Sequence, residues 1–309
     1  MLTSDQAIEI PPTAGLPLYL KDLFPSWSDN FSRKIAEFLG VPTVGVECSG
    51  TASLIVILET LSRLSARKTV VIPAYTCPLV IFAIVKSRLQ LRICDTCPDS
   101  FELDPEALAK LCDNDTLAIV PTHLGGRVAD LNSIITLARQ CGAYVIEDAA
   151  QALGARYQGE SVGLRGDAGF FSLAAGKGLS IFEGGLWIAA DAELRAELRR
   201  TSLQIVPARL GWEALRCLQL AGYAAAYRPL ALRYIYGNSL RRALRRRDSI
   251  AATGDYFSSN IPLHRVCAWR KAVGSRALLR LADFQRDLAR QAARRLPEPG
   301  LRPRPLQQL

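Results

Sequence analysis

Short apolar runs alternate with amphipathic helical patterns over residues 44–190. The apolar runs have the length and β-rich composition of strands, and they cover Val44–Glu47, Thr69–Pro73, Leu89–Asp95, Leu117–Pro121, Ala143–Asp148 and Leu186–Ala189. Helices are predicted between them, at Ala52–Leu64, Leu79–Ser87, Pro105–Leu111 and Leu131–Gln140. This alternation predicts an α/β fold in which a mostly parallel sheet is flanked by helices on both faces.

The carboxyl ends of the predicted strands carry much of the candidate chemistry. Parallel sheets bind their ligands at this edge. Ser49, Tyr75, His123 and Asp148 all lie at or just after a predicted strand end. We therefore expect an active site along this edge.

The pattern changes beyond about residue 200. Leu210–Tyr236 is apolar and helical in character with a break at Arg228-Pro229, and its longest uncharged stretch is far shorter than the ~20 residues that a membrane span requires. An arginine run follows at 241–247. We interpret this region as a helical insertion packed on an enzyme, with a surface amphipathic segment as the alternative. Another helix is predicted over His264–Leu296.

The length and these changes of pattern suggest three parts. A chain of 309 residues has room for one large domain and part of a second. We assign residues 1–200 to a large α/β domain, 201–262 to a basic helical connector, and 263–309 to the start of a smaller C-terminal domain. We expect that last domain to be truncated, because the chain stops in a Pro/Arg-rich tail.

Positive charge is concentrated in the second part of the chain. The net charge is +9, with 38 Lys/Arg and 29 Asp/Glu. Residues 201–309 hold 20 of the basic and 6 of the acidic residues, so they carry +14 while residues 1–200 carry −5. This asymmetry indicates that the C-terminal part meets an anionic group. The candidates are a phosphate-bearing substrate, a membrane surface or an acidic face of a partner subunit.

Composition and motifs argue against several classes of protein. The start lacks a signal peptide, so we expect a cytoplasmic protein whose eight cysteines are reduced thiols. The Cys94-x-x-Cys97 pair has no second pair or histidine cluster beside it, and we predict no metal site. No Gly-x-Gly-x-x-Gly follows a strand. We interpret the arginine run as a solvated helix face, and we expect no nucleic-acid binding.

Asp148 and Lys177 are the strongest candidates for catalysis. Asp148 ends an apolar strand, where a carboxylate needs a partner such as a pyridinium nitrogen, although a helix cap or a salt bridge would also satisfy it. Lys177 lies between Gly176 and Gly178 in an apolar run, so it is either an exposed loop lysine or a desolvated nucleophile. A pyridoxal phosphate (PLP) enzyme needs a lysine and an acid of this kind.

Two further features suit such a cofactor without being specific for it. Ser49-Gly50-Thr51 joins a strand to a helix, where backbone N–H groups and hydroxyls can hold a phosphate, or where the residues serve only as a turn and cap. Gln151 follows Asp148 closely and could contact the ring oxygen of the cofactor, or it could be a surface residue.

Six motifs together resemble the DegT/DnrJ/EryC1/StrS family of PLP-dependent sugar aminotransferases. In order, they are Cys48-Ser49-Gly50-Thr51-Ala52, Val71-Ile72-Pro73-Ala74-Tyr75-Thr76, Thr122-His123-Leu124-Gly125-Gly126, Glu147–Ala155, Gly166–Ser172, and Lys177 with Glu183-Gly184-Gly185. The resemblance runs from about residue 30 to 200 in the family's order and spacing. It implies the type I fold of PLP-dependent aminotransferases, with PLP as cofactor.

The resemblance also implies roles for single residues. Lys177 would form the Schiff base with the cofactor and later move protons, and Asp148 would pair with the pyridine nitrogen. Gln151 would contact the ring oxygen. Ser172 and the Ser49-Gly50-Thr51 turn would hold the phosphate.

The implied reaction moves an amino group from an amino acid, commonly glutamate, to the keto carbon of a nucleotide-linked sugar. It would serve the synthesis of polysaccharides or glycosylated metabolites. Enzymes of this fold build each active site across a two-fold interface, so a homodimer is expected. The alternatives are a PLP-dependent sugar dehydratase, which the presence of Lys177 disfavours, and a non-catalytic truncated relative.

Two departures from the family pattern favour the non-catalytic alternative. Cys77 occupies a position where the family often has an aromatic residue that stacks on the cofactor, so Tyr75 is the candidate for that contact. The expected truncation of the smaller domain would remove part of the sugar pocket.

Overall fold

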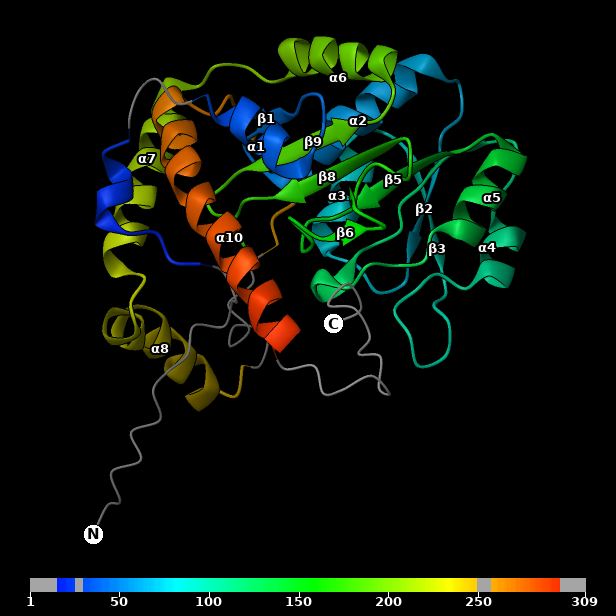
Figure 1. Cartoon of the computed structure of the whole chain (residues 1–309). Helices are drawn as coiled ribbons and strands as arrows, with labels where there is room; N and C mark the ends of the chain where they lie inside the picture. The colour runs from blue at the N-terminus through cyan, green and yellow to red at the C-terminus, as the bar shows by residue number, and fades with distance from the viewer. Residues whose placement is uncertain (1–15, 26–29, 249–256, 295–309) are drawn as a thin grey trace.

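The computed structural model describes residues 16–25, 30–248 and 257–294, and a seven-stranded sheet lies between helices at its centre (Figure 1). The strands of this sheet lie in the order β1-β9-β8-β5-β4-β2-β3. Their bounds are β1 (Gly45–Glu47), β2 (Thr69–Pro73), β3 (Gln90–Cys94), β4 (Thr116–Ile119), β5 (Tyr144–Asp148), β8 (Ala168–Ser172) and β9 (Gly185–Ala189). A separate hairpin pairs β6 (Arg156–Tyr157) with β7 (Glu160–Ser161).

The helices cover both faces of the sheet and extend beyond its β1 end. Their bounds are α1 (Phe31–Leu39), α2 (Gly50–Leu64), α3 (Pro78–Lys86), α4 (Pro105–Leu111), α5 (Asn132–Cys141), α6 (Ala192–Ile205), α7 (Leu210–Ala226), α8 (Pro229–Arg245) and α10 (Ala268–Arg294). Two short 3-10 helices, η1 (Leu20–Leu23) and η2 (Leu124–Gly126), complete the described elements.

Strand direction brings the candidate residues to one edge of the sheet. The contacts of β2 with β3 and β4, of β4 with β5, and of β5 with β8 are parallel. β9 is antiparallel to both β8 and β1, so β9 alone runs against the other strands. The carboxyl ends of the other six strands therefore share an edge with the start of β9, as the α/β pattern predicts.

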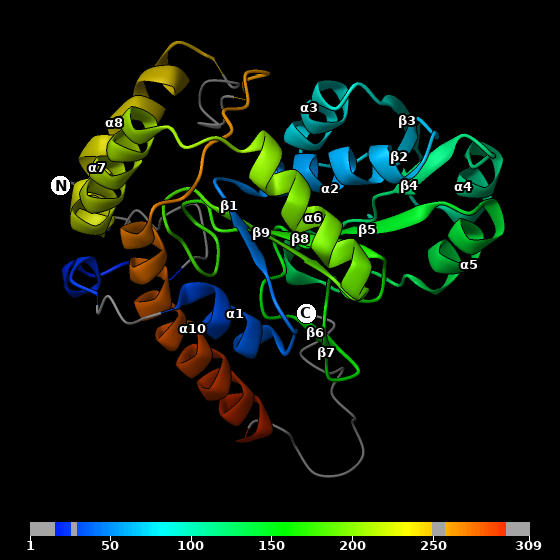
Figure 2. The ribbon, with the colours of Figure 1, turned by 90° about the horizontal axis from the view of Figure 1, so that it is seen from above.

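Alternating side chains along the strands build a core on each face. Val70 and Ile72 of β2 pack with α2 and α3, whereas Val71 between them packs with α4 and α5. In β8, Phe170 faces the α2 side and Phe171 faces the core formed with α1 and α10. This two-residue period is the expected result of a pleated strand. Figure 2 shows α2, α3 and α6 on one side of the sheet and α1 and α10 on the other.

The helix α10 packs into the same core as the first part of the chain. Val273 and Leu281 lie with Phe31 and Ile35 of α1 in one buried cluster. Residues far apart in sequence thus share a core. The division into a large domain, a connector and a truncated smaller domain stays a prediction, and the Pro/Arg-rich tail of that prediction falls mostly outside the described residues.

The predicted elements match the structure closely, with a few differences. The predicted strand Thr69–Pro73 and helix Pro105–Leu111 have the same bounds in the structure, and the predicted break after residue 227 separates α7 from α8. The strand β8 was not predicted as a strand, because its Ala-Gly-Phe-Phe-Ser sequence shows neither alternation nor a run of β-branched residues. The last helix begins at Ala268 rather than at His264.

Candidate active site at the carboxyl edge of the sheet

Asp148 is a buried carboxylate at the carboxyl end of β5. Its side chain is 4% exposed, and its Oδ1 accepts a hydrogen bond from the backbone N–H of Ala150 at 3.0 Å. Burial raises the pKa of Asp148 to about 6, although the Ala150 hydrogen bond and the charges of His123 and Lys177 act to lower it. The hydrogen bond and the nearby groups therefore do not fully offset the cost of burying the negative charge. A cation bound beside Asp148 would stabilise the ionised form.

Lys177 lies in the loop between β8 and β9. Backbone hydrogen bonds tie this loop together, from Leu173 to Gly184 at 2.7 Å and from Ala175 to Phe182 at 2.8 Å. Gly176 just before the lysine has φ +83°, a conformation that glycine adopts without strain. The side chain of Lys177 is partly buried and close enough to Asp148 to lower its pKa. The structure thus brings the two strongest sequence candidates together.

The turn Ser49-Gly50-Thr51 opens α2 directly against the end of β8. Ser49 caps the helix, because its Oγ accepts from the backbone N–H of Ala52 at 3.0 Å. A Cβ added to Gly50 would lie 3.3 Å from the Cβ of Ser172. Three candidate phosphate ligands therefore share one small region, namely the turn, the first backbone N–H groups of α2 and Ser172.

The start of β9 packs against the backbone of the same turn. A Cβ added to Gly185 would lie 2.2 Å from the carbonyl oxygen of Ser49 and 2.4 Å from the nitrogen of Gly50. Both obstacles are backbone atoms, so no side chain can replace this glycine without moving the turn. The last glycine of the Glu183-Gly184-Gly185 motif is thus required for steric reasons.

A buried histidine–glutamate pair lies next to Asp148. His123 Nε2 lies 2.9 Å from Glu147 Oε2, and His123 Nδ1 accepts from the backbone N–H of Ala129 at 3.1 Å. The acceptor role of Nδ1 makes Nε2 the donor to Glu147. Glu147 also accepts from the N–H groups of Gly163 and Gly166, both at 2.7 Å. These contacts fix the β4–β5 edge below Asp148. The sequence placed His123 at this edge, but the role of Glu147 was not predicted.

Thr122 provides a polar group at the same edge that has no partner within the described residues. It forms a parallel bridge with Asp148, and its Oγ1 is buried without a hydrogen bond. Gln151 also points into this region, because its Oε1 accepts from the backbone N–H of Gly125 at 2.9 Å. That bond leaves the amide nitrogen of Gln151 as the donor end. Gln151 itself is exposed, so it lies at the surface of this edge, and its contact with a cofactor stays a prediction.

Tyr75 lies after β2 and is less closely joined to this group of residues. Its ring is 58% exposed, and its centroid lies 4.8 Å from that of Phe101 in a tilted arrangement. Cys77, which is exposed, caps the start of α3. Stacking of Tyr75 on a cofactor stays a prediction.

A buried ion network, which the sequence did not reveal, supports the Lys177 loop from behind. Arg270 of α10 is fully buried, and its Nη1 lies 2.6 Å from Oε1 of Glu213 in α7. The same guanidinium donates to the carbonyl oxygens of Ile181 (3.3 Å from Nη2) and Glu183. Burial by itself raises the pKa of Glu213, but hydrogen bonds from His264 and Arg270 outweigh it and bring the pKa to about 2. The loop backbone is thus held by a charged group that depends on two helices.

Cys94 and Cys97 lie outside the group of potential metal ligands that the described residues contain. The eight cysteines are thiols and form no disulfide within the described residues. Within the described residues, the only group of potential ligands that could hold a metal consists of Glu213, Cys217 and Cys267. The carboxylate oxygens of Glu213 already bind Arg270 and His264, so this group lacks an open acidic ligand.

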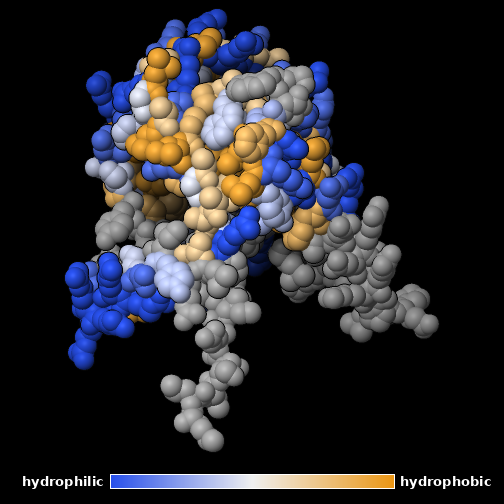
Figure 3. Space-filling model, turned by 90° about the vertical axis from the view of Figure 1, so that its left-hand side faces the viewer, coloured by the Kyte–Doolittle hydropathy of each residue, from blue (hydrophilic) through white to orange (hydrophobic). Residues whose placement is uncertain are grey.

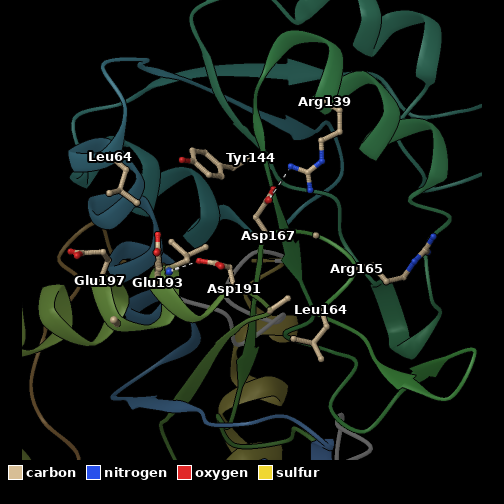
Figure 4. A pocket seen from close by; sticks show the side chains of 13 residues that line it. Leu64, Arg139, Tyr144, Leu164, Arg165, Asp167, Asp191, Glu193 and Glu197 are labelled. Atoms are coloured by element: carbon tan, nitrogen blue, oxygen red, sulfur yellow. Dashed lines mark hydrogen bonds and ion pairs between the residues drawn. The ribbon is translucent and has the colours of Figure 1, made fainter.

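A hollow among the described residues lies at the opposite edge of the sheet. Its volume is about 800 Å³, and it is lined by Tyr144, which begins β5, whereas Asp148 ends that strand. Figure 4 shows Arg139 pointing to Asp167, and these side chains form an ion pair at 3.2 Å. Asp191 in the same wall caps α6. Arg139, Asp167 and Asp191 thus have structural partners, and we assign the active site to the other edge.

The residues at the carboxyl edge fit PLP. Asp148 is a buried acid that a pyridinium cation would satisfy, and Thr122 has a buried hydroxyl with no partner among the described residues. The Gly50–Ser172 region has the small residues and N–H groups that a phosphate requires. Lys177 lies beside this acid. Each of these features is seen in the protein without a cofactor.

Comparisons with known proteins agree with this fit. The model of the DegT/DnrJ/EryC1/StrS aminotransferase family matches residues 26–222. Protein MosB of Rhizobium meliloti is 38% identical over 175 residues, which are 55% of this chain and 33% of that protein. The L-glutamine:2-deoxy-scyllo-inosose aminotransferase of Streptomyces fradiae is 35% identical over 164 residues, 53% of this chain and 38% of that enzyme.

The fold is also that of solved aminotransferases. The sugar aminotransferase CalS13 from Micromonospora echinospora has a TM-score of 0.62 at 23% identity, over 92% of this chain and 72% of that one. The regions matched in these two curated relatives are 33% and 38% of their lengths, so the chain spans well under half of each. The family model covers more than half of this chain, including the strands and loops that form the carboxyl edge. The chain therefore belongs to the DegT/DnrJ/EryC1/StrS family of PLP-dependent aminotransferases.

Proposed function

We propose that this protein is a PLP-dependent aminotransferase that moves an amino group from an amino acid to the keto carbon of a sugar or a sugar-like ring. The observation that carries the proposal is the placement of Lys177 beside the buried Asp148, at the edge where Ser172 and the start of α2 also meet. For the acceptor we propose a nucleotide-linked keto sugar.

Each residue of the edge has a defined task in this reaction. Bound PLP would supply an electron sink for the electrons released when the amino acid loses its α-proton. Asp148 keeps the ring nitrogen protonated, and the burial that raises its pKa makes this pairing strong. Lys177 attaches the cofactor covalently and, once released, carries a proton to and from the substrate carbon.

The phosphate would bind at the start of α2. Ser172 and the Ser49-Gly50-Thr51 turn offer hydroxyls and backbone N–H groups there, and the helix N-terminus favours negative charge. Gln151 would donate to the ring oxygen through its amide nitrogen, while Gly125 holds its Oε1. These contacts would orient the cofactor between the two reactive side chains.

The amino donor is either glutamate or glutamine. Glutamate is our expectation from the sequence motifs, whereas the Streptomyces fradiae relative is named for glutamine and for an inosose acceptor. The two donors differ in the side chain, which ends in a carboxylate in glutamate and in a carboxamide in glutamine. A direct comparison of both donors, each with a nucleotide-linked keto sugar and with an inosose, distinguishes them.

The deciding experiment tests covalent attachment. The purified chain is incubated with PLP, reduced with borohydride, digested and examined by mass spectrometry. We expect the reduced cofactor on the peptide that contains Lys177, and no labelled peptide in Lys177→Ala. Lys68→Ala, which changes an exposed lysine at the amino edge of the sheet, is the matched control and should keep the label. Labelling that survives in Lys177→Ala would refute the assignment.

Activity and assembly need separate measurements. Amino transfer is followed by chromatography of the donor-derived keto acid and of the aminated acceptor. Label on Lys177 without transfer to any acceptor would favour the non-catalytic alternative. The homodimer stays a prediction, which light scattering coupled to size exclusion tests.

A further inference from the structure

The helix α7 presents an apolar face to solvent along its whole length. Seventeen residues give this helix a length of roughly 25 Å. Leu210 is 85% exposed, Leu218 70% and Leu215 43%. The exposed residues of this side, which we call the α7 face, are Leu210, Gly211, Ala214, Leu215, Leu218, Gly222 and Ala225. None of these side chains is polar.

The opposite side of α7 fixes the helix to the protein. Glu213, Leu220 and Ala224 are buried, and Glu213 is held by Arg270 and His264. The outward direction of the leucines is therefore set by packing. Exposed leucines usually occur singly, whereas a continuous apolar helix face marks a binding surface.

The neighbouring η1 extends the apolar surface. This 3-10 helix packs against α7, and Leu20 is 47% exposed and Phe24, just after it, is 79% exposed. Figure 3 looks onto this side of the molecule and shows hydrophobic surface in its upper part, with a strongly hydrophilic projection below.

Exposed arginines flank α7 in the sequence and gather at the end of α8. Arg209 precedes the helix and Arg228 follows it, and both are exposed. The end of α8 adds an exposed group of cations, Arg242, Arg245, Arg246 and Arg247. The described part of α7 and α8 contains one acidic residue, Glu213, which is buried on the other side. Arginines near an apolar face can lay their stems on a lipid surface and place their charges among phosphates.

We propose that the α7 face and the arginines of α8 bind the protein to an anionic membrane surface, with α7 lying in the plane of the headgroups. Among the described residues, no helix could span a bilayer. A second copy fits this face less well. A two-fold contact between two α7 faces would bring the arginines of both copies into the same interface. These like charges would repel each other. The inference is independent of the proposed reaction.

The test measures co-flotation of the 309-residue chain with vesicles. One set contains phosphatidylcholine with 30% phosphatidylglycerol, and the other contains phosphatidylcholine alone. We expect binding to the anionic vesicles at least tenfold stronger than to the neutral ones. Raising the salt from about 0.1 M to 0.5 M should weaken it, because the Debye length shortens from about 10 Å to under 5 Å.

Two variants separate the apolar and the charged contributions. Leu210→Glu/Leu218→Glu should weaken vesicle binding at least tenfold. Arg245→Gln/Arg246→Gln/Arg247→Gln should weaken binding to the anionic vesicles by a similar factor, since each basic residue near such a surface contributes roughly fivefold. Leu203→Glu is the matched control, because Leu203 is 59% exposed on α6, and it should change binding less than twofold.

Circular dichroism and thermal melting establish that each variant is folded. Lack of binding to anionic vesicles by the wild-type chain would overturn the proposal, as would equal binding by the leucine variant. A third contrary result is self-association that Leu210→Glu/Leu218→Glu abolishes in light scattering while vesicles have no effect. That outcome would assign the face to a second copy.

Discussion

The ammonium group of Lys177 is near enough to the carboxylate of Asp148 to lower its pKa, but burial outweighs this effect and raises the pKa of Asp148 to about 6. One group lies in the loop before β9 and the other at the end of β5. Lys177 therefore only partly compensates a charge that the fold places away from water. This unfavourable arrangement is expected of a binding site, because functional groups are often destabilising before their ligand is bound.

Asp148 makes the cofactor-free protein less stable at neutral pH than at acid pH. Because its folded pKa lies above the ordinary value of 3.8, its contribution favours the folded state below pH 4 and is lost as the pH rises through about 6. The shift corresponds to on the order of 3 kcal/mol. We expect Asp148→Asn to be more stable than the wild type at pH 8, with the difference vanishing near pH 4. Urea unfolding at both pH values measures it.

The same substitution should weaken PLP binding at least tenfold, because asparagine cannot hold a pyridinium cation by charge. Asp283→Asn is the control, since that side chain is 61% exposed on α10, and it should alter neither quantity. An Asp148→Asn variant that binds PLP normally and gains no stability would contradict the role of this acid.

Loss of the Thr122 hydroxyl should raise the stability of the cofactor-free chain but weaken ligand binding. Its hydroxyl is buried and has no hydrogen-bond partner in the described part of the chain, and such a group costs about 1–3 kcal/mol. The isosteric change Thr122→Val should therefore stabilise the cofactor-free chain, by about 1 kcal/mol, and weaken PLP binding if the hydroxyl contacts the cofactor. Thermal melting with and without PLP measures both effects. Thr136→Val is a suitable comparison, because the Thr136 hydroxyl bonds a backbone carbonyl on an exposed part of α5 and does not lie at this edge.

Gly185 controls the shape of the phosphate turn. An alanine there would place its Cβ 2.2 Å from the backbone oxygen of Ser49, so the turn must move. We expect Gly185→Ala to lower PLP affinity at least tenfold and to lower the melting temperature by several degrees. Gly222→Ala tests the substitution in open space, since nothing lies within 4 Å of the added atom, and it should leave PLP binding unchanged. Equal affinities in wild type and Gly185→Ala would show that phosphate binds elsewhere.

The Glu213–Arg270 pair should dominate the stability of the contact between α7 and α10. Glu213→Gln leaves a buried guanidinium without its counter-charge, and loss of one partner of a buried pair costs roughly 3–5 kcal/mol. The double variant Glu213→Gln/Arg270→Met should lose less than the sum of the two single variants. Arg286→Ala removes one partner of an exposed pair on α10 and should have little effect. Additive losses at Glu213 and Arg270 would mean that the two residues do not act together.

The sequence was most informative where function and local pattern coincide. Ser49, His123 and Asp148 lie where the strand–helix pattern predicted, because a parallel sheet collects its carboxyl ends at one edge. The strand β8 escaped prediction, since Gly169 and two adjacent phenylalanines obscure its period, and only the family motif marked it. Local sequence had left Lys177 as either an exposed or a desolvated lysine, and the fold makes it partly buried.

The network around Arg270 could not be predicted from local patterns. Its partners are Glu213 on another helix and the carbonyl groups of residues 181 and 183. In the sequence Arg270 is one of many arginines in a helical pattern that reads as polar. Its complete burial depends on how α7 and α10 pack, which is a property of tertiary structure.

The contact of Arg270 with the backbone of residues 181 and 183 also sets an order for assembly at the ribosome. The sheet and the segment with Lys177 leave the exit tunnel many residues before α10 has been translated. Until then the Lys177 loop lacks the guanidinium that binds its carbonyl groups. The loop that carries the Lys177 amine is therefore incompletely held in the nascent chain. Maturation of the site therefore waits for α10 to emerge.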